Sequence, residues 1–283
     1  HAPKVRTRGS IRQSPTANSD YTADELRAIV DRHAGSDWRL RRLQGRVLVG
    51  PMGVDVSGFS PERRSEAVRQ QLLSSLGSDS TGTLLVYAGR VSPEKHVVGL
   101  PAMIRHLVAR GINARLVICG DGPLRAAIER SAAAEAPGRL RVLGHVDRET
   151  LADVLASADV FVHPNPREPF GIGPLEAMAS GLPVVLPRSG GVLTYANDDN
   201  AWLAAATPEG LAQTVSCVVR RPALARERAD VAFDTAQRYA WPAAVATYFD
   251  HYDTLDEARR SAAWSPSEPG RVGQPFPSLN DRA

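Results

Sequence analysis

Short apolar runs alternate with longer amphipathic stretches through the middle of the chain. The runs are rich in β-branched residues and read LLVYAG, ARLVICG, RLRVLGHV, ADVFVHP and PVVLP. Helical periodicity follows them, with helices expected up to Arg110, from Pro123 and from Arg148. Buried strands that alternate with helices are typical of βαβ units and of a parallel sheet covered on both faces. The pattern predicts an α/β domain with a doubly wound parallel sheet over residues 81–240.

The N-terminal part of the chain has a different pattern. Residues 1–20 are polar and lack periodicity, which predicts a disordered segment or a truncated edge. The following stretch, TADELRAIVDRHAG, predicts a helix with Thr22 as its N-cap, Glu25 as the capping-box partner and Gly35 as its stop. The segment RVLVG then predicts a short strand.

Two further regions complete the expected organisation. The turn-rich stretch GVDVSGFSPERR predicts a connector between domains over residues 56–80. Helical periodicity returns over residues 207–260, and we expect a last helix over residues 241–262. Residues 263–283 contain several prolines without periodicity, so we expect a disordered tail.

Composition and charge narrow the function classes. A chain of 283 residues with 43% hydrophobic residues can form one large domain or two smaller ones. Its 34 basic and 31 acidic residues are spread along the chain without a basic stripe, which makes nucleic acid an unfavourable partner. No apolar run reaches the length of a membrane span, and the N-terminus lacks a signal-peptide pattern. These features predict a soluble protein.

The cysteines and the first residue add two expectations. Cys119 and Cys217 lie far apart, which argues against a disulfide framework or a zinc site and favours a reducing, cytoplasmic setting. The chain begins with His1 rather than methionine, so we expect a processed chain or a fragment.

Ligands of doubly wound sheets bind beyond the carboxyl ends of the strands, and the loop AGRVSPEKH follows the first predicted strand. It carries Arg90 and Lys95, whose guanidinium and ammonium groups suit an oxygen-rich anion. The alternative is a pair of solvated surface cations. Lys95 weakens that alternative, because the chain has only one other lysine, Lys4, and uses arginine elsewhere.

The next two loops give weaker signals. In CGDGPLR, Gly120 and Gly122 permit close backbone approach before a helix start, but Arg125 replaces the third glycine of a dinucleotide fingerprint. Alone, this pattern is more often a tight turn. In LGHVDRE, the segment 144–146 ends a strand before a helix capped by Asp147. A purely structural role for this loop is favoured over a role in ligand binding.

The segment REPFGIGPLEAMASG contains the remaining candidates. Glu168 and Glu176 lie eight positions apart, and we expect Pro174 to be the first residue of a helix that Gly181 ends. The amides of residues 170–173 would then form an anion-ready helix start. Paired carboxylates can act as general acid and base, but ionised carboxylates also bind pairs of hydroxyls. The simpler alternatives are a solvated loop acid and an acid that complements the helix dipole.

His163, at the end of ADVFVHP, is also a candidate, although a lone histidine at a strand end is more often structural than catalytic.

These motifs together resemble a known family. GR-x4-K at 89–95, GDGP at 120–123, LGHV at 143–146 and EPFGIGPLEAMASGLPVV are similar to the C-terminal, nucleotide-sugar-binding half of retaining GT-B glycosyltransferases of family 4. The resemblance runs from about residue 52 to 255 and implies a Rossmann-like domain. Where many members carry a glutamate after PVVLPRSGG, this chain reads VLTYANDDNAWLA, which leaves sugar and acceptor choice open.

The resemblance also implies roles for individual residues. Arg90 and Lys95 match the pair that neutralises the donor diphosphate. Glu168 matches the acid that holds sugar hydroxyls, and Glu176 matches the acid on the ribose. Val146 lies where the base is contacted. The implied donor site as a whole comprises Gly89, Arg90, Lys95, Gly120, Val146, Glu168, Phe170, Gly171, Ile172 and Glu176, of which Glu168, Arg90 and Lys95 are also the implied catalytic residues. No metal and no cofactor are implied.

The implied function is transfer of a hexose from a UDP- or GDP-sugar to a hydroxyl acceptor, which is a lipid, a saccharide or a small molecule. Family members carry an N-terminal acceptor domain, and here we expect residues 21–55 to be its remnant. Any peripheral membrane contact is expected through that missing domain. The alternatives are a non-catalytic nucleotide-sugar-binding module and a GT-B-type sugar epimerase.

Overall fold

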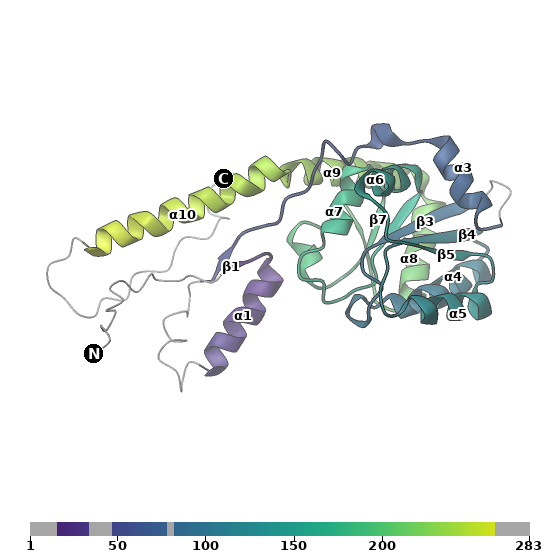
Figure 1. The fold of residues 1–283 in the computed structure, drawn as a ribbon, viewed down its shortest axis with the longest axis horizontal. Coiled ribbons are helices and arrows are strands. Elements are labelled where there is room, and N and C mark those ends of the chain that lie inside the picture. The colour runs from purple at the N-terminus through teal and green to yellow at the C-terminus, as the bar shows by residue number, and fades with distance from the viewer. Residues whose placement is uncertain (1–15, 34–46, 78–81, 264–283) are drawn as a thin grey trace, which may run out of the picture. The chain divides into compact units, whose positions relative to one another are not determined.

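The computed structural model describes residues 16–33, 47–77 and 82–263 (Figure 1). The chain forms two compact units. One unit contains the described residues up to 50 together with those from 247 onward, and the other contains the described residues within 51–246.

The larger unit contains a six-stranded parallel sheet with the strand order β5-β4-β3-β6-β7-β8. The strands are β3 (Thr83–Ala88), β4 (Ala114–Cys119), β5 (Leu140–Gly144), β6 (Val160–Val162), β7 (Val184–Pro187) and β8 (Trp202–Ala204). This order is that of a doubly wound, Rossmann-like sheet, so the predicted fold class is confirmed. The first five strands coincide with the predicted apolar runs, whereas the edge strand β8 was not predicted.

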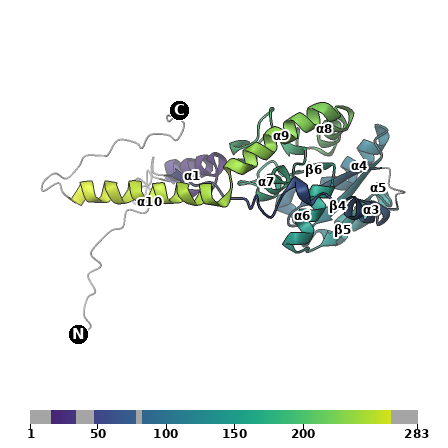
Figure 2. The ribbon, with the colours of Figure 1, turned by 90° about the horizontal axis from the view of Figure 1, so that it is seen from above.

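Helices cover both faces of this sheet (Figures 1 and 2). They are α3 (Glu66–Ser74), α4 (Leu100–Ala109), α5 (Arg125–Glu135), α6 (Arg148–Ser157), α7 (Ile172–Ala179), α8 (Pro208–Arg220) and α9 (Pro222–Arg238). Helix α10 (Trp241–Ala263) follows them and continues beyond the larger unit. Alternate side chains of β3 belong to different cores. Leu84 and Val86 pack in a cluster with α3, α6, α7 and α9, and Leu85 packs in a cluster with α4, α5 and α8.

Two predicted helix starts were wrong by two residues. Pro123 and Leu124 form a turn in which the Leu124 amide donates to Val91 O at 3.1 Å, so α5 begins at Arg125. Helix α7 begins at Ile172, with Gly171 as its N-cap, so Pro174 is its third residue rather than its first. Proline is tolerated there because the first four amides of a helix have no partner within it.

The smaller unit corrects the predicted N-terminal pattern. β1 (Thr16–Ala17) pairs in parallel with the predicted strand, β2 (Leu48–Val49), so residues 16–20 are ordered rather than disordered. Helix α1 (Asp20–His33) begins before Thr22, whose amide donates to Ser19 Oγ at 3.1 Å. Ser19, and not Thr22, is therefore the capping side chain.

The Glu25 carboxylate accepts a hydrogen bond from the Tyr21 hydroxyl at 2.9 Å. The predicted stop at Gly35 and the predicted tail beyond residue 263 lie outside the described residues. No helix in the described ranges is long and apolar enough to cross a membrane.

Asp159 ties α3 to the sheet. Its Oδ2 atom accepts hydrogen bonds from Arg69 Nη1 at 2.7 Å and from the Leu84 amide at 2.8 Å. The Arg69 side chain is 14% exposed, so this pair is better shielded from water than the pair between Arg63 and Asp153, whose side chains are 34% and 39% exposed.

We expect Asp159→Ala to lower the free energy of unfolding by about 1–3 kcal/mol, because the Leu84 amide loses its acceptor and the shielded Arg69 guanidinium keeps only its hydrogen bond to Gly82 O. Asp153→Ala is the matched control and should lower it by less than about 1 kcal/mol. Urea unfolding followed by circular dichroism measures both. Equal losses in the two variants would contradict this account of how α3 is held.

Candidate functional site

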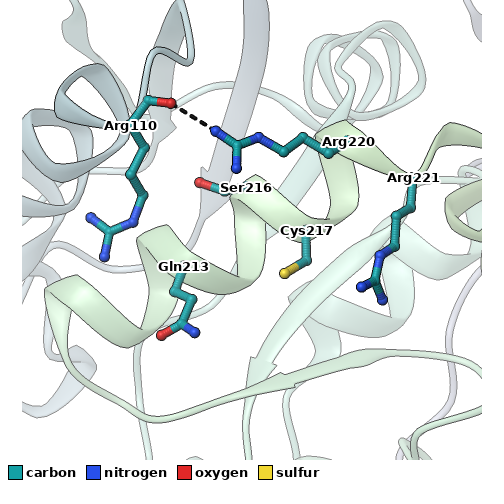
Figure 3. A pocket seen from close by; sticks show the side chains of 6 residues that line it. All are labelled: Arg110, Gln213, Ser216, Cys217, Arg220 and Arg221. Carbon is teal, nitrogen blue, oxygen red and sulfur yellow. Dashed lines mark hydrogen bonds between the residues drawn. The ribbon is translucent and has the colours of Figure 1, made fainter.

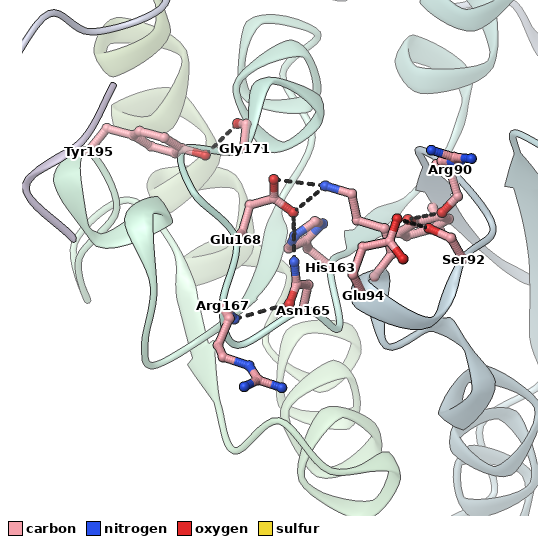
Figure 4. Close-up of polar contacts among 11 residues, drawn as sticks. Arg90, Ser92, Glu94, His163, Asn165, Arg167, Glu168, Gly171 and Tyr195 are labelled. Atoms are coloured by element: carbon pink, nitrogen blue, oxygen red, sulfur yellow. Dashed lines mark hydrogen bonds and ion pairs between the residues drawn. The ribbon is translucent and has the colours of Figure 1, made fainter. Parts of the chain in front are cut away.

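The candidate site lies where the strand order reverses. β3 and β6 are neighbours in the sheet, but the chain leaves β3 toward β4 on one side and leaves β6 toward β7 on the other. The loops that follow β3 and β6 therefore diverge, and such crevices are the usual ligand sites of doubly wound sheets. The first loop carries Arg90 and Lys95, and the second carries residues 163–168 (Figure 4).

Glu168 is the centre of this site. Lys95 Nζ donates to Glu168 Oε1 and Oε2, each at 2.9 Å. Asn165 Nδ2 donates to Oε2 at 3.0 Å, and His163 Nε2 lies 3.0 Å from the same oxygen. The Glu168 side chain is 8% exposed and that of Lys95 is 26% exposed, so the ion pair is largely shielded from water.

These contacts determine the ionisation of Glu168. Burial alone would raise the pKa of the carboxyl group, but hydrogen bonds and charge interactions with His163 and Lys95 outweigh burial and lower the pKa to about 2. Glu168 is therefore a carboxylate at neutral pH. A group this acidic is a poor general base near pH 7, so the acid and base interpretation of the two glutamates is weakened.

The loop after β3 reaches the same place. Lys95 lies in a short 3-10 turn, Pro93–Lys95, rather than at the start of a longer helix. The Tyr87 hydroxyl donates to Arg90 O at 3.1 Å, and burial, with the charges of Glu168 and Glu94, raises the pKa of Tyr87. The Arg90 side chain is exposed, and its guanidinium has no hydrogen bond within the described residues.

The main chain of the Glu168 loop is held by the segment after β7. The Gly191 amide donates to Glu168 O at 2.6 Å, and the Ser189 hydroxyl donates to Pro166 O at 2.9 Å. A Cβ atom on Gly191 would lie 1.9 Å from Pro169 O, so only glycine permits this approach. This segment directly precedes the stretch in which the sequence departs from the related family, and it positions the loop that carries Glu168.

Aromatic packing fixes the start of α7. The Tyr195 hydroxyl donates to Gly171 O at 2.6 Å, and the Tyr195 ring contacts that of Phe170 edge-on with centroids 5.4 Å apart. Phe170 is buried and also packs against Tyr239. Gly171 and Ile172 are therefore placed at the helix N-terminus, where the dipole favours an anion.

Glu176 has an environment unlike that of Glu168. It is the fifth residue of α7, in the second turn and not the first. Burial raises the pKa of this half-buried carboxyl group, with a smaller opposing effect of Arg148. No hydrogen bond to its carboxylate is found within the described part of the chain. Within the described residues, the Glu168 carboxylate thus has several hydrogen-bond donors and the Glu176 carboxylate has none.

Gly89 and Gly120 bring neighbouring loops together. The Gly89 amide donates to Cys119 O at 3.0 Å, and the Gly120 amide donates to Gly144 O at 2.8 Å. Gly120 has φ of +152°, and a Cβ atom there would lie 1.9 Å from Gly89 O. The observed role of Gly120 is this close approach, and its contact with a donor stays a prediction. Val146 is half-buried at the edge of the same region and packs against the core.

The sequence patterns did not indicate the contacts of His163 and Asn165 with Glu168, or that of Tyr195 with Gly171 O. The available signal was the position of His163 and Asn165 in the same loop as Glu168, five and three residues before it.

A separate pocket of 320 Å³ is visible in Figure 3. It lies beside the carboxyl ends of α4 and α8 and is lined by Arg110, Gln213, Ser216, Cys217, Arg220 and Arg221. Those helix ends lie toward the amino-terminal ends of the strands, whereas the loop that carries Glu168 follows the carboxyl end of β6. None of the predicted donor-site residues lines this pocket.

Comparison with known protein families assigns the sequence to one of them. A family model described as "Glycosyl transferases group 1" matches residues 68–232, which include every predicted donor-site residue. The chain belongs to this family. The match agrees with the resemblance inferred from the motifs alone.

Curated relatives of this group 1 chain include two bacterial glycosyltransferases. It is 38% identical over 198 residues to the GDP-mannose-dependent alpha-(1-6)-phosphatidylinositol dimannoside mannosyltransferase of Mycobacterium tuberculosis, covering 70% of this chain and 49% of the relative. It is 34% identical over 222 residues to the D-inositol 3-phosphate glycosyltransferase of Xylanimonas cellulosilytica, covering 76% and 52%. The chain thus spans about half the length of these relatives.

Solved structures share the fold. The C-terminal domain of a glycosyl transferase group 1 family protein from Francisella tularensis matches with a TM-score of 0.56 and 18% identity, covering 67% of this chain and all of that domain. At this identity the likeness shows the fold alone, and it agrees with a C-terminal domain of the GT-B type.

The pKa of Glu168 gives a prediction for the stability of this domain. Because folding lowers the pKa from 4.5 to about 2, the carboxylate stabilises the fold above pH 4.5, and that stabilisation is lost as the pH falls toward 2. Wild type should exceed Glu168→Gln in stability at pH 6, and the difference should shrink by on the order of 3 kcal/mol toward pH 2.

Urea unfolding at a series of pH values measures this difference. Glu209→Gln, which alters a carboxylate with a 70% exposed side chain, is the control and should follow the wild-type curve. A difference between wild type and Glu168→Gln that stays constant from pH 6 to the lowest measurable pH would show that folding does not lower this pKa.

Proposed function

We propose that this chain is the donor-binding part of a retaining glycosyltransferase, and that it holds a UDP- or GDP-sugar beyond the carboxyl ends of β3 and β6. The whole enzyme would transfer a hexose to a hydroxyl acceptor. The observation that carries the proposal is the largely shielded ion pair of Lys95 and Glu168 at the reversal of strand order, followed directly by the start of α7.

The charges suit the parts of a sugar nucleotide. An ammonium group has three donors, and Lys95 uses two of them on Glu168, which leaves one for a phosphate oxygen. Arg90 has an exposed guanidinium that can bind phosphate through two parallel hydrogen bonds. The free amides at the start of α7 add a third source of positive potential. We assign the donor diphosphate to these groups.

The two glutamates suit hydroxyl groups at either end of the donor. Glu168 remains ionised and offers an acceptor to the transferred sugar. Glu176 is half-buried, has a raised pKa and lacks a hydrogen-bond partner within the described residues, so a pair of ribose hydroxyls would supply the donors that it needs. Val146, which follows β5, remains the proposed contact to the base.

The proposed chemistry is mainly electrostatic. Arg90, Lys95 and the amides of α7 would stabilise the negative charge that develops on the departing diphosphate. With a pKa of about 2, Glu168 would act as a binding group and not as the base. The leaving diphosphate itself would take the acceptor proton, with retention of the anomeric configuration. We expect transfer without a metal or a cofactor.

The names of the relatives suggest donors to test first. The mycobacterial relative is named as GDP-mannose-dependent, and an Anabaena protein of the same fold was solved with UDP and glucose, with a TM-score of 0.66 and 17% identity over 85% of this chain and 62% of that one. The relatives are named as transferases, which does not favour the epimerase or binding-module alternatives. We propose a lipid, saccharide or small-molecule acceptor, with any membrane contact outside this domain.

The free thiols of Cys119 and Cys217 support a reducing, cytoplasmic location.

Ligand-induced stabilisation tests the proposal. We expect GDP-mannose or UDP-glucose at a hundredfold its dissociation constant to stabilise the chain by about 2.7 kcal/mol, seen as a raised melting temperature. Arg221→Gln, which alters the distant pocket, should respond like wild type, and Lys95→Met should lose most of the response. No stabilisation of the folded chain by any sugar nucleotide would refute the proposal.

Substitutions of the two glutamates should have different effects on ligand affinity. Glu176→Ala should weaken nucleotide binding by about 1–3 kcal/mol, because it removes charged hydrogen bonds to the ribose. Glu168→Ala should weaken binding of the sugar nucleotide more than binding of the nucleotide alone. Calorimetric titration measures both, with Glu209→Ala as the exposed control. Equal nucleotide affinities of wild type and Glu176→Ala would disprove the ribose assignment.

A further inference from the structure

The two oxygens of the Glu168 carboxylate are occupied unequally. Among the described residues, Oε2 accepts hydrogen bonds from Lys95, Asn165 and His163 within 3.0 Å, whereas Oε1 accepts one from Lys95 alone. A carboxylate has about four lone-pair sites, two on each oxygen. Oε2 therefore has no site left for a ligand, and Oε1 has one.

We propose that His163 and Asn165 are positioning residues, which saturate Oε2 so that Glu168 presents only Oε1, beside Lys95 Nζ, to the sugar of the donor. This inference rests on the proposed function. It makes the assignment of Glu168 more specific, because it predicts that the carboxylate binds one sugar hydroxyl and not a pair.

Asn165 is held so that only its amide nitrogen can face Glu168. Its Oδ1 atom accepts the Arg167 amide at 3.0 Å, and its Nδ2 atom donates to Oε2. The reversed amide would direct oxygen at the carboxylate and nitrogen at a backbone donor. Asn165 is 3% exposed, so water does not supply an alternative arrangement.

His163 is held by the sheet and by ring packing. Its amide donates to Val185 O at 2.9 Å, which extends the pairing of β6 with β7. Its ring stacks on Phe161 with an interplanar angle of 8° and on Tyr87 with an angle of 19°. His163 is 3% exposed, and its Nδ1 atom has no hydrogen-bond partner within the described residues. The contact with Glu168 is therefore the one polar interaction found for the ring.

The unequal hydrogen bonding of the two Glu168 oxygens affects which sugar nucleotide the site selects. A site that binds a hydroxyl through a buried charged group rejects analogues that lack this hydroxyl far more strongly than an apolar pocket rejects a change of size. With only Oε1 available, this selection applies to one position of the sugar. If Oε2 were freed, the carboxylate could turn and the selection would weaken.

The test compares affinities for GDP-mannose and GDP, or for UDP-glucose and UDP if that pair binds better, by calorimetry on the full chain. The measured quantity is the sugar ratio, defined as the affinity for the sugar nucleotide divided by that for the nucleotide. We expect His163→Leu to lower the sugar ratio by about tenfold while nucleotide affinity changes by less than about twofold.

Two further variants separate positioning from folding. His163→Gln can still donate from the place of Nε2 and should keep the sugar ratio within about threefold of wild type. Asn165→Ser can still accept from the Arg167 amide but cannot reach Oε2, so it should lower the ratio by about three- to tenfold. His106→Leu, on α4, is the matched control and should leave it unchanged. If His163→Leu does not fold, the Asn165→Ser result decides.

The outcomes distinguish the two levels of the proposal. A wild-type chain that binds no nucleotide and no sugar nucleotide would overturn the proposed function and this inference together. A wild-type sugar ratio near one would overturn the assignment of Glu168 to the sugar, and the inference with it. Folded His163→Leu and Asn165→Ser variants with a wild-type sugar ratio would overturn the positioning roles alone.

Discussion

A buried carboxylate requires donors, and the arrangement of this site follows from how Glu168 obtains them. An ion removed from water without partners is strongly unfavourable, and one charge partner alone often fails to compensate for desolvation. Glu168 has an ammonium, an amide and an imidazole around it. Lys95 comes from the loop after β3 and the other two from the loop after β6. The carboxylate therefore joins the two loops at the reversal of strand order.

The backbone supports this arrangement from the other side. The segment after β7 binds the carbonyl groups of Pro166, Glu168 and Gly171 through a hydroxyl, an amide and a phenol. Side-chain donors fix the carboxylate, and these main-chain contacts fix the loop that carries it. A site with both kinds of support is preorganised, so a donor sugar would meet a carboxylate that is already ionised and oriented. Glu176 is the complementary case, because its carboxylate has no hydrogen-bond partner in the described part of the chain, and in the proposed site ligand hydroxyl groups would supply the donors.

Burial and side-chain pattern explain what the sequence could predict. β3, β4 and β7 are buried on both faces and therefore appear as apolar runs rich in β-branched residues, whereas β8 has three residues at the sheet edge and its run, AWLAAA, contains no β-branched residue. The motifs placed Lys95 and Glu168 in one donor site, but the two residues are 73 positions apart and no sequence rule predicts their direct pairing. The predicted cap Asp147 is observed at the start of α6, whereas the cap of α1 is Ser19 rather than the predicted Thr22, because the helix begins earlier than the pattern indicated.

Hydrogen exchange measured by mass spectrometry tests the central claim most directly, namely that the loops after β3 and β6 form one donor site around Glu168. The experiment compares the free chain with the chain saturated by the sugar nucleotide that stabilises it most. The account predicts slower exchange in peptides covering residues 89–95 and 165–176, and unchanged exchange in residues 213–221 beside the separate pocket. Protection confined to residues 213–221, with residues 165–176 unaffected, would contradict it.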